Sequence, residues 1–498
     1  MDGKIRVPHP AKPFMFRLGS ARTVWRETPF QDVNFGQILS TPLMPNLIKE
    51  SIPYFEDSAV LFTTCADKPW AVFLDSAFPV SQQGRFDIMA YDPICTIETR
   101  GVRTIITRDG NQVVSEADPF ELIKQQLGPV LPRVDDLPFN GGALGYFAYD
   151  LARRIEKLPV IAEDAEHLAE MAVGIYRWAI VVDHQERQSW LVGYDLSEQS
   201  VAELIEQFSC LSRQHGVSDF KVLAPPQSNM SREVYGQAFK KIKHYLKEGD
   251  CYQVNLTQRF ISSCKGNPWF AYQVLRKINP APFSAYLNLP DVKVLSSSPE
   301  RFLKVTEGVV ETKPIKGTRP RKALAVDDQR QMAELSKSTK DRAENVMIVD
   351  LLRNDISKDC KEGSVKVPKL FAVESYATVH HLVSTVVGEL ADGRHALDLL
   401  RSCFPGGSIT GAPKIRSMEV IEELEPHRRG IYCGAIGYIG FDGNMDTNIA
   451  IRTLVHNRDS IRFWVGGGIV NDSDEVAEYQ ECFDKAAALL QLLEQFRQ

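Results

Sequence analysis

Residues 435–470 read AIGYIGFDGNMDTNIAIRTLVHNRDSIRFWVGGGIV and decide the fold of this chain. Three runs in this stretch, AIGYIGF, NIAIRTLVHN and IRFWVGGGIV, are rich in β-branched and aromatic residues, which are typical of strands. FSAYLNL and VKVLSSS, within residues 283–298, predict two more strands. Amphipathic patterns at 327–354 and 474–497 predict long helices. Because strands and helices are grouped rather than alternating, the sequence favours an α+β fold.

The first half of the chain is predicted to be rich in antiparallel strands. The candidate strands are AVLFTT (59–64), WAVFLDSAF (70–78), CTIETRGVRTIITRDG (95–110), GIYRWAIVVDH (174–184) and QSWLVGYD (188–195). A helix is expected at 197–214, and a second helix opens with a cap-like Ser231 after a linker at 222–232. We therefore predict a loosely ordered, proline-rich leader at 1–45 and two regions at 46–225 and 231–498.

Composition excludes several classes of protein. The 498 residues include 44% hydrophobic and 24% charged residues, which is typical of a compact soluble protein. With 58 basic against 64 acidic side chains, we expect no nucleic-acid partner. No apolar run is long enough for a membrane span. The nine cysteines form no C-x-x-C pair, which fits a reducing cytoplasm.

Two pairs of acidic residues lie on predicted helices at a spacing of three residues. Over residues 332–355, which include DRAENVMIVDLLRND, apolar Met332, Leu335, Ala343, Val346, Met347 and Leu351 recur at helical spacing and leave Asp341 and Glu344 on another face. Glu478 and Glu481 repeat the arrangement in the last helix. The four carboxylates are suited to one hard cation, while a solvated helix face is the alternative.

Other residues have a chemical interpretation beside a structural one. Gly466, Gly467 and Gly468 follow a strand and either present backbone N–H groups to a carboxylate or form a β-bulge. His380 and His381 lack partners at metal spacing. Glu300 and Lys316 are predicted on neighbouring strands joined by a turn around Glu307 and Gly308. FPGGSITGAPK lacks the Gly-Lys-Ser/Thr ending of a phosphate-binding loop.

Taken in order, several segments resemble those of the chorismate-utilising enzymes. They are GDCYQVNLTQRF (249–260), SSSPERF (296–302), KPIKGTRPR (313–321), DRAENVMIVDLLRND (341–355), HHLVSTVVG (380–388), FPGGSITGAPKIRSME (404–419), GAIGYIGFDGNMDTNIAIRT (434–453), and GGGIV with YQECFDK (466–485). The resemblance runs from about residue 55 to the C-terminus. It implies an anthranilate synthase component I-like fold, with a large, sandwich-like antiparallel β core and flanking helices.

The resemblance also implies roles for individual residues. Glu344 and Glu481 would bind Mg²⁺, with Asp341 and Glu478 holding metal-bound waters behind them. Chorismate would be held by Arg452, Tyr432 and the backbone of the three glycines, with Ser408 and Lys485 as further substrate-site positions. His381 matches the active-site histidine of the family.

Two positions separate the reactions of this family. Members that add water to chorismate carry a lysine where this chain has Gln253, and anthranilate synthases carry an alanine where it has Lys316. PIKGT with lysine resembles the aminodeoxychorismate synthases. The resemblance implies that neutral Lys316 attacks ring C2 while Glu300 protonates the departing C4 hydroxyl, after which ammonia enters at C4. An anthranilate synthase and a non-catalytic subunit that binds a glutaminase remain the alternatives.

The resemblance further implies a partner and a second pocket. No G-x-C-x-G nucleophile elbow is present in the sequence, so ammonia would come from a separate glutaminase (glutamine amidotransferase) subunit. In this family the N-terminal half and the PFSA segment form a tryptophan pocket. The matching residues are Ser76, Gln83, Gly84, Arg85, Phe86, Pro282, Phe283 and Ser284. Gln83 and Gly84 replace the usual tyrosine-serine pair, and core packing is the alternative to a bound tryptophan.

Overall fold

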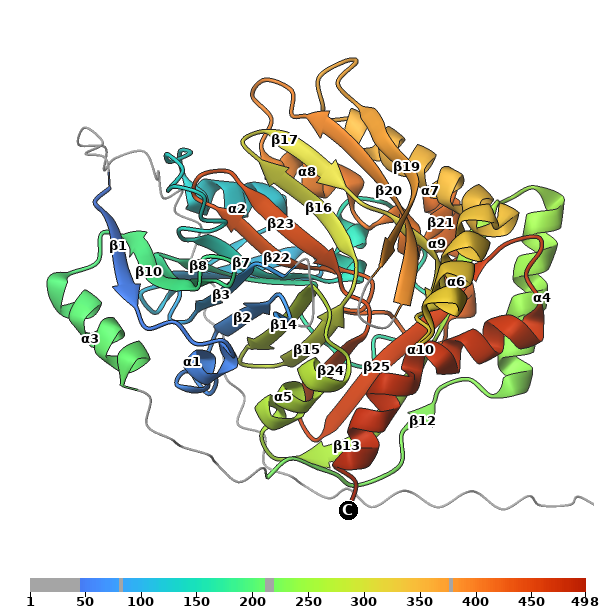
Figure 1. The fold of residues 1–498 in the computed structure, drawn as a ribbon, viewed down its shortest axis with the longest axis horizontal. Coiled ribbons are helices and arrows are strands. Elements are labelled where there is room, and N and C mark those ends of the chain that lie inside the picture. The colour runs from blue at the N-terminus through green and yellow to red at the C-terminus, as the bar shows by residue number, and fades with distance from the viewer. Residues whose placement is uncertain (1–44, 80–83, 211–218, 376–378) are drawn as a thin grey trace, which may run out of the picture. The chain divides into compact units, whose positions relative to one another are not determined.

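The computed structural model describes residues 45–79, 84–210, 219–375 and 379–498. All but the last residue of the predicted leader at 1–45 lie outside these ranges, as does Gln83. Residues 46–498 form a compact unit built around two large antiparallel sheets. This arrangement confirms the predicted α+β class with a sandwich-like β core (Figure 1).

The first sheet has 13 strands within the described residues, in the order β1-β10-β9-β3-β2-β14-β15-β24-β25-β13-β11, with β12 and β21 also paired to β13. Its strands are β1 (Leu47–Ile52), β2 (Ala71–Asp75), β3 (Phe86–Ala90), β9 (Trp178–Asp183), β10 (Gln188–Tyr194), β11 (Lys221–Val222), β12 (Gln227–Ser228), β13 (Gln253–Lys265), β14 (Phe283–Asn288), β15 (Lys293–Ser298), β21 (Gly411–Ala412), β24 (Thr453–Asn457) and β25 (Ser460–Ile469).

The second sheet has 12 described strands in the order β18-β20-β17-β16-β23-β22-β7-β8-β4-β5-β6, with β19 on the other edge of β20. Its strands are β4 (Cys95–Arg100), β5 (Arg103–Arg108), β6 (Asn111–Ser115), β7 (Gly142–Phe147), β8 (Met171–Tyr176), β16 (Arg301–Thr306), β17 (Val309–Thr312), β18 (Ile315–Pro320), β19 (Lys366–Ser375), β20 (Val379–Glu389), β22 (Ala435–Gly440) and β23 (Met445–Ile449).

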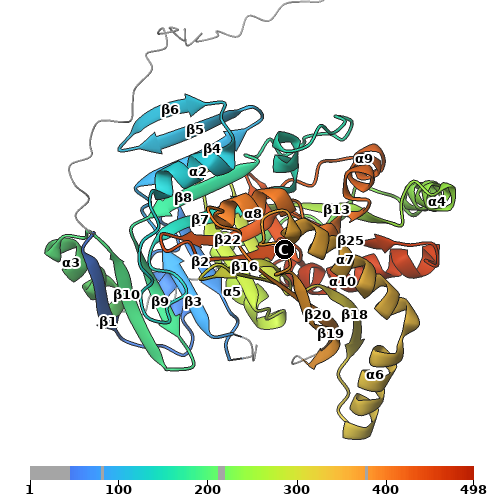
Figure 2. The same cartoon turned by 90° about the horizontal axis from the view of Figure 1, so that it is seen from above.

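Helices flank the two sheets. They are α1 (Ala59–Thr63), α2 (Pro119–Leu127), α3 (Glu198–Ser209), α4 (Arg232–Glu248), α5 (Pro268–Ile278), α6 (Ala325–Lys337), α7 (Thr339–Ser357), α8 (Ala396–Cys403), α9 (Lys414–Leu424) and α10 (Glu475–Gln495), with short 3-10 turns η1 (Tyr149–Arg154) and η2 (Gly407–Ile409). Figure 2 shows α6 and β5–β6 at opposite ends of this unit. Within the described ranges, no helix is long and apolar enough to cross a membrane.

The alternation of side chains along β2 explains how the layers pack. Val72 belongs to the apolar cluster shared by the two sheets, whereas its neighbours Ala71 and Phe73 belong to a second cluster between the first sheet and its helices. Successive side chains of a strand point to opposite faces, so a strand that is buried on both faces must be apolar throughout. This is why the central strands of the first sheet form continuous apolar runs.

The boundary predicted near Ser231 does not separate two domains. Ser231 is a helix cap, since its hydroxyl accepts the N–H of Val234 at 3.3 Å. However, β2 pairs with β14 in the first sheet, and β7 pairs with β22 in the second. Strands from 46–225 and from 231–498 therefore complete the same two sheets, and neither range has a core of its own.

Three local predictions were wrong. AVLFTT forms helix α1 rather than a strand. A short run of apolar residues shows neither the helical nor the strand periodicity, so its sequence cannot distinguish the two structures. The helix at 327–354 is two helices, since Ser338 ends α6 and caps α7 through its hydroxyl. On α7 the buried face includes Asn345 and Ile348, while Val346 is exposed. Asn345 turns this face inward because its side chain bonds to Ser384 and to the carbonyl of Leu382.

The aromatic cluster beneath the first sheet provides a test of the layered core. The fully buried Phe73 ring lies 5.2 Å from Phe62 and 6.3 Å from Trp269 between centroids. Replacing Phe73 with alanine leaves a cavity that these fixed rings cannot fill, so we expect a loss of about 3–5 kcal/mol in the free energy of unfolding. Denaturant titration measures the loss. Val113→Ala, on the exposed β6, should change the same quantity by less than about 0.5 kcal/mol.

Candidate active site

Lys316 is positioned by a β-bulge in β18. Lys316 is opposite Leu382 and Thr318 is opposite His381, so Gly317 is an extra residue in the strand. Because neighbours on β20 point to opposite faces, the bulge places Lys316 and Thr318 on opposite faces as well. Gly317 has a φ of 76°, a conformation that glycine adopts easily. A β-carbon there would lie 2.8 Å from Asp341 Cγ, so β18 packs closely against α7.

The predicted hairpin between Glu300 and Lys316 is not formed as expected. The turn at Glu307 and Gly308 joins β16 to β17, as predicted, but Lys316 lies beyond β17, on β18. Both β17 and β18 pair with β20, one after the other along its length. Lys316 therefore does not face Glu300 across a pair of adjacent strands, although each side chain influences the pKa of the other.

Glu300 is a buried carboxyl group at the start of β16. Its Oε1 accepts a hydrogen bond of 2.8 Å from the Ser408 hydroxyl, which is carried by η2 in the loop between α8 and α9. Burial raises the pKa of Glu300, and the hydrogen bond from Ser408 and the charge of Lys316 only partly oppose this shift. Glu300 is therefore disposed to hold a proton that it can donate.

The pKa of Lys316 is shifted in the opposite direction from that of Glu300. Burial lowers the pKa of its ammonium group, while Glu344 and Glu300 oppose that shift and the nearby Lys485 adds to it. Both Lys316 and Glu300 are thus biased toward their uncharged forms. An uncharged amine beside a protonated carboxyl group is the pair needed for a nucleophile and a general acid.

The four predicted metal-binding carboxylates lie near one another, on α7 and α10. A β-carbon on Gly467 would lie 3.1 Å from Glu478 Oε2 and 3.6 Å from Glu481 Oε1, so the missing side chain leaves room beside these groups. Burial raises the pKa of Glu344; the charges of Lys316 and Lys340 oppose this shift, and those of Asp341 and Glu481 add to it. The all-oxygen donor set therefore fits a hard cation such as Mg²⁺.

These carboxylates do not form a closed cage in the structure. Among the described residues, no three His, Cys, Asp or Glu side chains converge closely enough to hold a metal ion. Basic side chains accompany the acids instead. Glu481 forms an ion pair of 2.6 Å with Lys485, and Asp341 forms one of 3.1 Å with Arg319. Burial raises the pKa of Glu481, but the charge of Lys485 and its hydrogen bond outweigh that effect and lower it.

The three consecutive glycines lie in a regular strand rather than a β-bulge. Gly466, Gly467 and Gly468 pair in register with β13. On its other edge, β25 pairs with β24 only from Phe463 to Ser460. In the described part of the chain, the glycine segment thus has one edge without a strand partner, where its backbone is suited to binding an anion.

The remaining predicted substrate residues surround this glycine segment. Lys485 donates to the carbonyl of Gly466 at 2.9 Å, and Arg452 donates to the carbonyl of Lys485 at 2.6 Å. Tyr432 stacks on Trp464, with ring centroids 6.0 Å apart, and its phenol influences the pKa of Arg452. Cationic and aromatic groups therefore converge beside the carboxylates of α10.

The two adjacent histidines differ in environment. His380 is fully buried and is hydrogen-bonded to Asp328 at 2.9 Å and to Ser375 at 2.8 Å. His381 Nδ1 lies 2.9 Å from the Thr318 hydroxyl. Burial lowers the pKa of His381 to about 4. His381 is therefore neutral at pH 7 and can accept or donate a hydrogen bond without carrying charge.

Gln253 lies directly behind the glycine segment. A β-carbon on Gly468 would lie 2.9 Å from the Gln253 amide, whose Nε2 donates to Asn255 Oδ1 at 3.0 Å. The Asn255 amide in turn donates to the carbonyl of Ser408 at 3.3 Å. Sequence reasoning did not find Asn255, because a lone asparagine in a predicted strand carries no signal of its own.

The described residues of the predicted tryptophan pocket gather around β2 and β14. Ser284 pairs with Asp75, the residue before Ser76. A β-carbon on Gly84 would lie 2.4 Å from the Ser76 carbonyl, and Arg85 lies over the Phe86 ring. Pro282 precedes Phe283, whose ring lies 4.8 Å from the Arg301 guanidinium. Occupation of this region by tryptophan stays a prediction.

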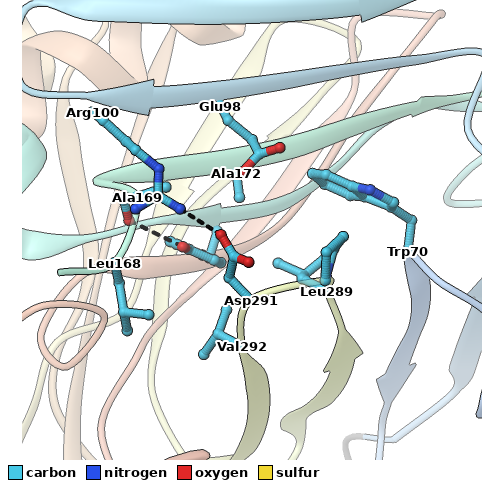
Figure 3. A pocket seen from close by; sticks show the side chains of 11 residues that line it. Trp70, Glu98, Arg100, Leu168, Ala169, Ala172, Leu289, Asp291 and Val292 are labelled. Carbon is cyan, nitrogen blue, oxygen red and sulfur yellow. Dashed lines mark hydrogen bonds and ion pairs between the residues drawn. The ribbon is translucent and has the colours of Figure 1, made fainter. Parts of the chain in front are cut away.

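A small cavity lies elsewhere in the molecule, next to Trp70 and Glu98 (Figure 3). An ion pair of 2.7 Å between Arg100 and Asp291 borders it. Its volume of about 10 Å³ admits at most about one water molecule. This cavity is too small to bind an organic substrate.

A comparison with protein families decides the assignment of the chain. Residues 73–491 match the family model described as chorismate binding enzyme. The chain belongs to this family. The matched range contains both sheets almost completely, together with every catalytic, substrate and metal residue that the sequence predicts.

Individual chorismate binding enzymes are similar over almost their full length. Aminodeoxychorismate synthase component 1 of Escherichia coli (strain K12) is 48% identical over 441 residues, which cover 87% of this chain and 95% of the relative. The protein of the same name from Klebsiella aerogenes is 49% identical over 457 residues, covering 91% and 100%. The crystal structure of anthranilate synthase component I from Streptococcus pneumoniae has a TM-score of 0.73 and 31% identity, covering 82% of this chain and 92% of that one.

The raised pKa of Glu300 gives a stability prediction. Protonation stabilises the folded state at low pH, and this contribution is lost as the pH rises through the folded-state pKa. Glutamine cannot ionise. Glu300→Gln should therefore raise the free energy of unfolding at pH 8 by about 1–3 kcal/mol, with a gain that shrinks toward pH 5.

Denaturant titrations at both pH values measure this effect, and Glu116→Gln, at an exposed site, serves as the matched control. A gain that is equal at both pH values, or one that the control reproduces, would contradict a buried, protonated Glu300.

Proposed function

We propose that this chain is the component of an aminodeoxychorismate synthase that converts chorismate and ammonia to 4-amino-4-deoxychorismate. The observation that carries the proposal is the proximity of buried Glu300 and half-buried Lys316, two groups whose desolvation biases them toward a protonated carboxyl group and a neutral amine. The names of the similar enzymes from Escherichia coli and Klebsiella aerogenes support the same reaction.

The proposed reaction has two substitution steps. The Lys316 amine forms a bond to ring C2, the two ring double bonds shift, and the C4–oxygen bond breaks while Glu300 donates a proton, so that water leaves. Ammonia then forms a bond to C4, the double bonds shift back, and the C2–nitrogen bond breaks so that Lys316 leaves as a neutral amine. The ammonium group formed at C4 returns a proton to the Glu300 carboxylate. Each step is an allylic substitution, which replaces a difficult direct displacement at C4.

The groups around this pair bind and orient the substrate. Arg452, Tyr432 and the glycine segment of β25 would hold one carboxylate, and neutral His381 would contribute a hydrogen bond without charge. Glu344 and Glu481 would hold Mg²⁺, with Asp341 and Glu478 behind them. When bound, the ion supplies positive charge to the ring carboxylate. Lys485 forms an ion pair with Glu481 and Arg319 forms one with Asp341, so the protein itself compensates part of the acidic charge.

We assign the supply of ammonia to a separate glutaminase subunit. The relatives from Escherichia coli and Klebsiella aerogenes are named component 1, which supports the existence of a second component. The sequence of this chain contains no G-x-C-x-G nucleophile elbow. Eight of the nine cysteines are buried and Cys210 is exposed, and the thiols of Cys251, Cys433 and Cys482, which adjoin the candidate site, have pKa values that burial raises.

Two other functions compete with this proposal. An anthranilate synthase would place ammonia at C2. The structural similarity to such an enzyme makes this reaction the main alternative. Lys316 argues against it, because its amine would occupy the route to C2. A non-catalytic subunit is disfavoured, because such a subunit would have no use for Glu300 and Lys316 in a buried site.

The product formed from chorismate, ammonium and Mg²⁺ tests the proposal. The parent chain should form 4-amino-4-deoxychorismate, identified by mass and ultraviolet spectrum. Lys316→Ala removes the nucleophile but keeps Glu300 and the carboxylate-binding groups. We therefore expect chorismate binding to persist, while formation of this product falls by about 10²-fold or more.

The matched control is Lys313→Ala. Lys313 lies in the same segment, but its charge is not among those that shift the pKa of Glu300. If the parent chain formed anthranilate, it would be an anthranilate synthase instead. If Lys316→Ala formed 4-amino-4-deoxychorismate at the rate of the parent chain, the covalent step would be excluded.

A further inference from the structure

Arg429 and Glu425 form a buried ion pair at the end of α9. The Arg429 side chain is only 1% exposed, and its Nε and Nη2 donate to the two carboxylate oxygens of Glu425 at 2.9 and 2.7 Å. The Tyr149 ring lies 4.9 Å from the guanidinium. Burying two charges costs several kcal/mol per ion, which the attraction between them only offsets when further hydrogen bonds satisfy both groups. The other contacts of this pair are therefore informative.

The remaining hydrogen bonds of the pair connect three segments of the candidate site. Arg429 Nη1 donates to the carbonyl of Ile409 at 2.8 Å, and Nη2 donates to that of Asn255 at 3.4 Å. Glu425 Oε1 accepts the N–H of Thr257 at 2.9 Å. The backbone carbonyl of Arg429 accepts the N–H of Tyr432 at 3.1 Å. One ion pair therefore joins η2, strand β13 and the turn that carries Tyr432.

The link to η2 bears directly on the general acid. Ile409 follows Ser408, whose hydroxyl donates to Glu300 at 2.8 Å. The Ser408 carbonyl accepts from the Asn255 amide, so Asn255 is connected to Arg429 through its own carbonyl and to Ser408 through its side chain. A shift of the Ile409 carbonyl would thus displace the hydroxyl that orients the Glu300 carboxyl group.

We propose that Arg429 is a positioning residue for the reaction, which holds Ser408 against Glu300 by fixing the carbonyl of Ile409. The inference rests on the proposed function, because it assigns Glu300 as the proton donor. Arg429 itself touches neither substrate nor reacting atoms. Its planar guanidinium reaches Glu425, Ile409 and Asn255 at once, and a lysine ammonium cannot reproduce this geometry.

A second buried arginine provides the matched control. Arg462 is 4% exposed, pairs with Glu166 at 3.2 Å and is hydrogen-bonded to Asn457 and Ser460. It lies at the start of β25, whereas the glycine segment lies at the end of the same strand. Arg462→Lys and Arg429→Lys therefore remove similar buried guanidinium contacts, but only Arg429 is bonded to the loop that carries Ser408.

Steady-state kinetics test the proposal, with rates corrected for the folded fraction. The variants compared are Arg429→Lys, Arg462→Lys, Ser408→Ala and the double variant Arg429→Lys/Ser408→Ala. Misplacement of a catalytic group by about 1 Å costs on the order of 10²-fold. We expect kcat of Arg429→Lys to fall by about this factor with KM little changed, and Arg462→Lys to keep the parent kcat. The double variant should be no slower than Ser408→Ala alone.

A readout without turnover separates this inference from the proposed reaction. Amide hydrogen exchange of residues 404–413 should accelerate in Arg429→Lys and stay at the parent rate in Arg462→Lys. If Arg429→Lys fails to fold, Glu425→Gln, which weakens the same pair but retains an acceptor for Thr257, should give the same pattern. Equal losses of kcat in both arginine variants, multiplicative losses in the double variant, or unchanged exchange would overturn the positioning role. A parent chain that makes another product would overturn the proposed function instead.

Discussion

Desolvation of Lys316 and Glu300 is the physical effect around which the rest of the site is arranged, Glu300 being buried and Lys316 half-buried. Burial disfavours the charged form of each group, so it lowers the pKa of the lysine and raises that of the glutamic acid. Their mutual attraction opposes both shifts but does not cancel them. A solvated surface pair would be a salt bridge with little chemical use, whereas two desolvated groups are suited to the proton transfer that we propose.

The two interleaved sheets explain how such a site is built. Glu300 lies at the start of β16 in the second sheet, while the glycine segment belongs to β25 in the first. The four carboxylates come from α7 and α10, Lys485 also lies on α10, and Arg452 directly precedes β24. Because strands from both halves of the chain complete each sheet, the first half supports the geometry even though the proposed catalytic groups lie in the second.

Much of this arrangement can be predicted from the sequence, for reasons that differ between residues. Apolar runs such as IRFWVGGGIV mark strands that are buried on both faces, and the three-residue spacing of Glu478 and Glu481 puts both on one side of α10. Local patterns fail where tertiary contacts decide. Asn345 turns the polar-looking face of α7 inward, and the bulge at Gly317 reverses the side on which Thr318 would otherwise lie. Arg429 and Glu425 carry no periodic signal, since their role depends on segments far apart in the sequence.

The protonation state of Glu300 is the central claim, and infrared difference spectroscopy observes it directly. The spectrum of the parent chain minus that of Glu300→Gln, recorded at pH 7 without substrate, isolates the vibrations of this one carboxyl group. The account predicts a carbonyl stretching band of a protonated carboxylic acid that shifts in deuterated water and is perturbed by Ser408→Ala. A difference spectrum with only the bands of an ionised carboxylate would contradict the account, because Glu300 would then have no proton to donate.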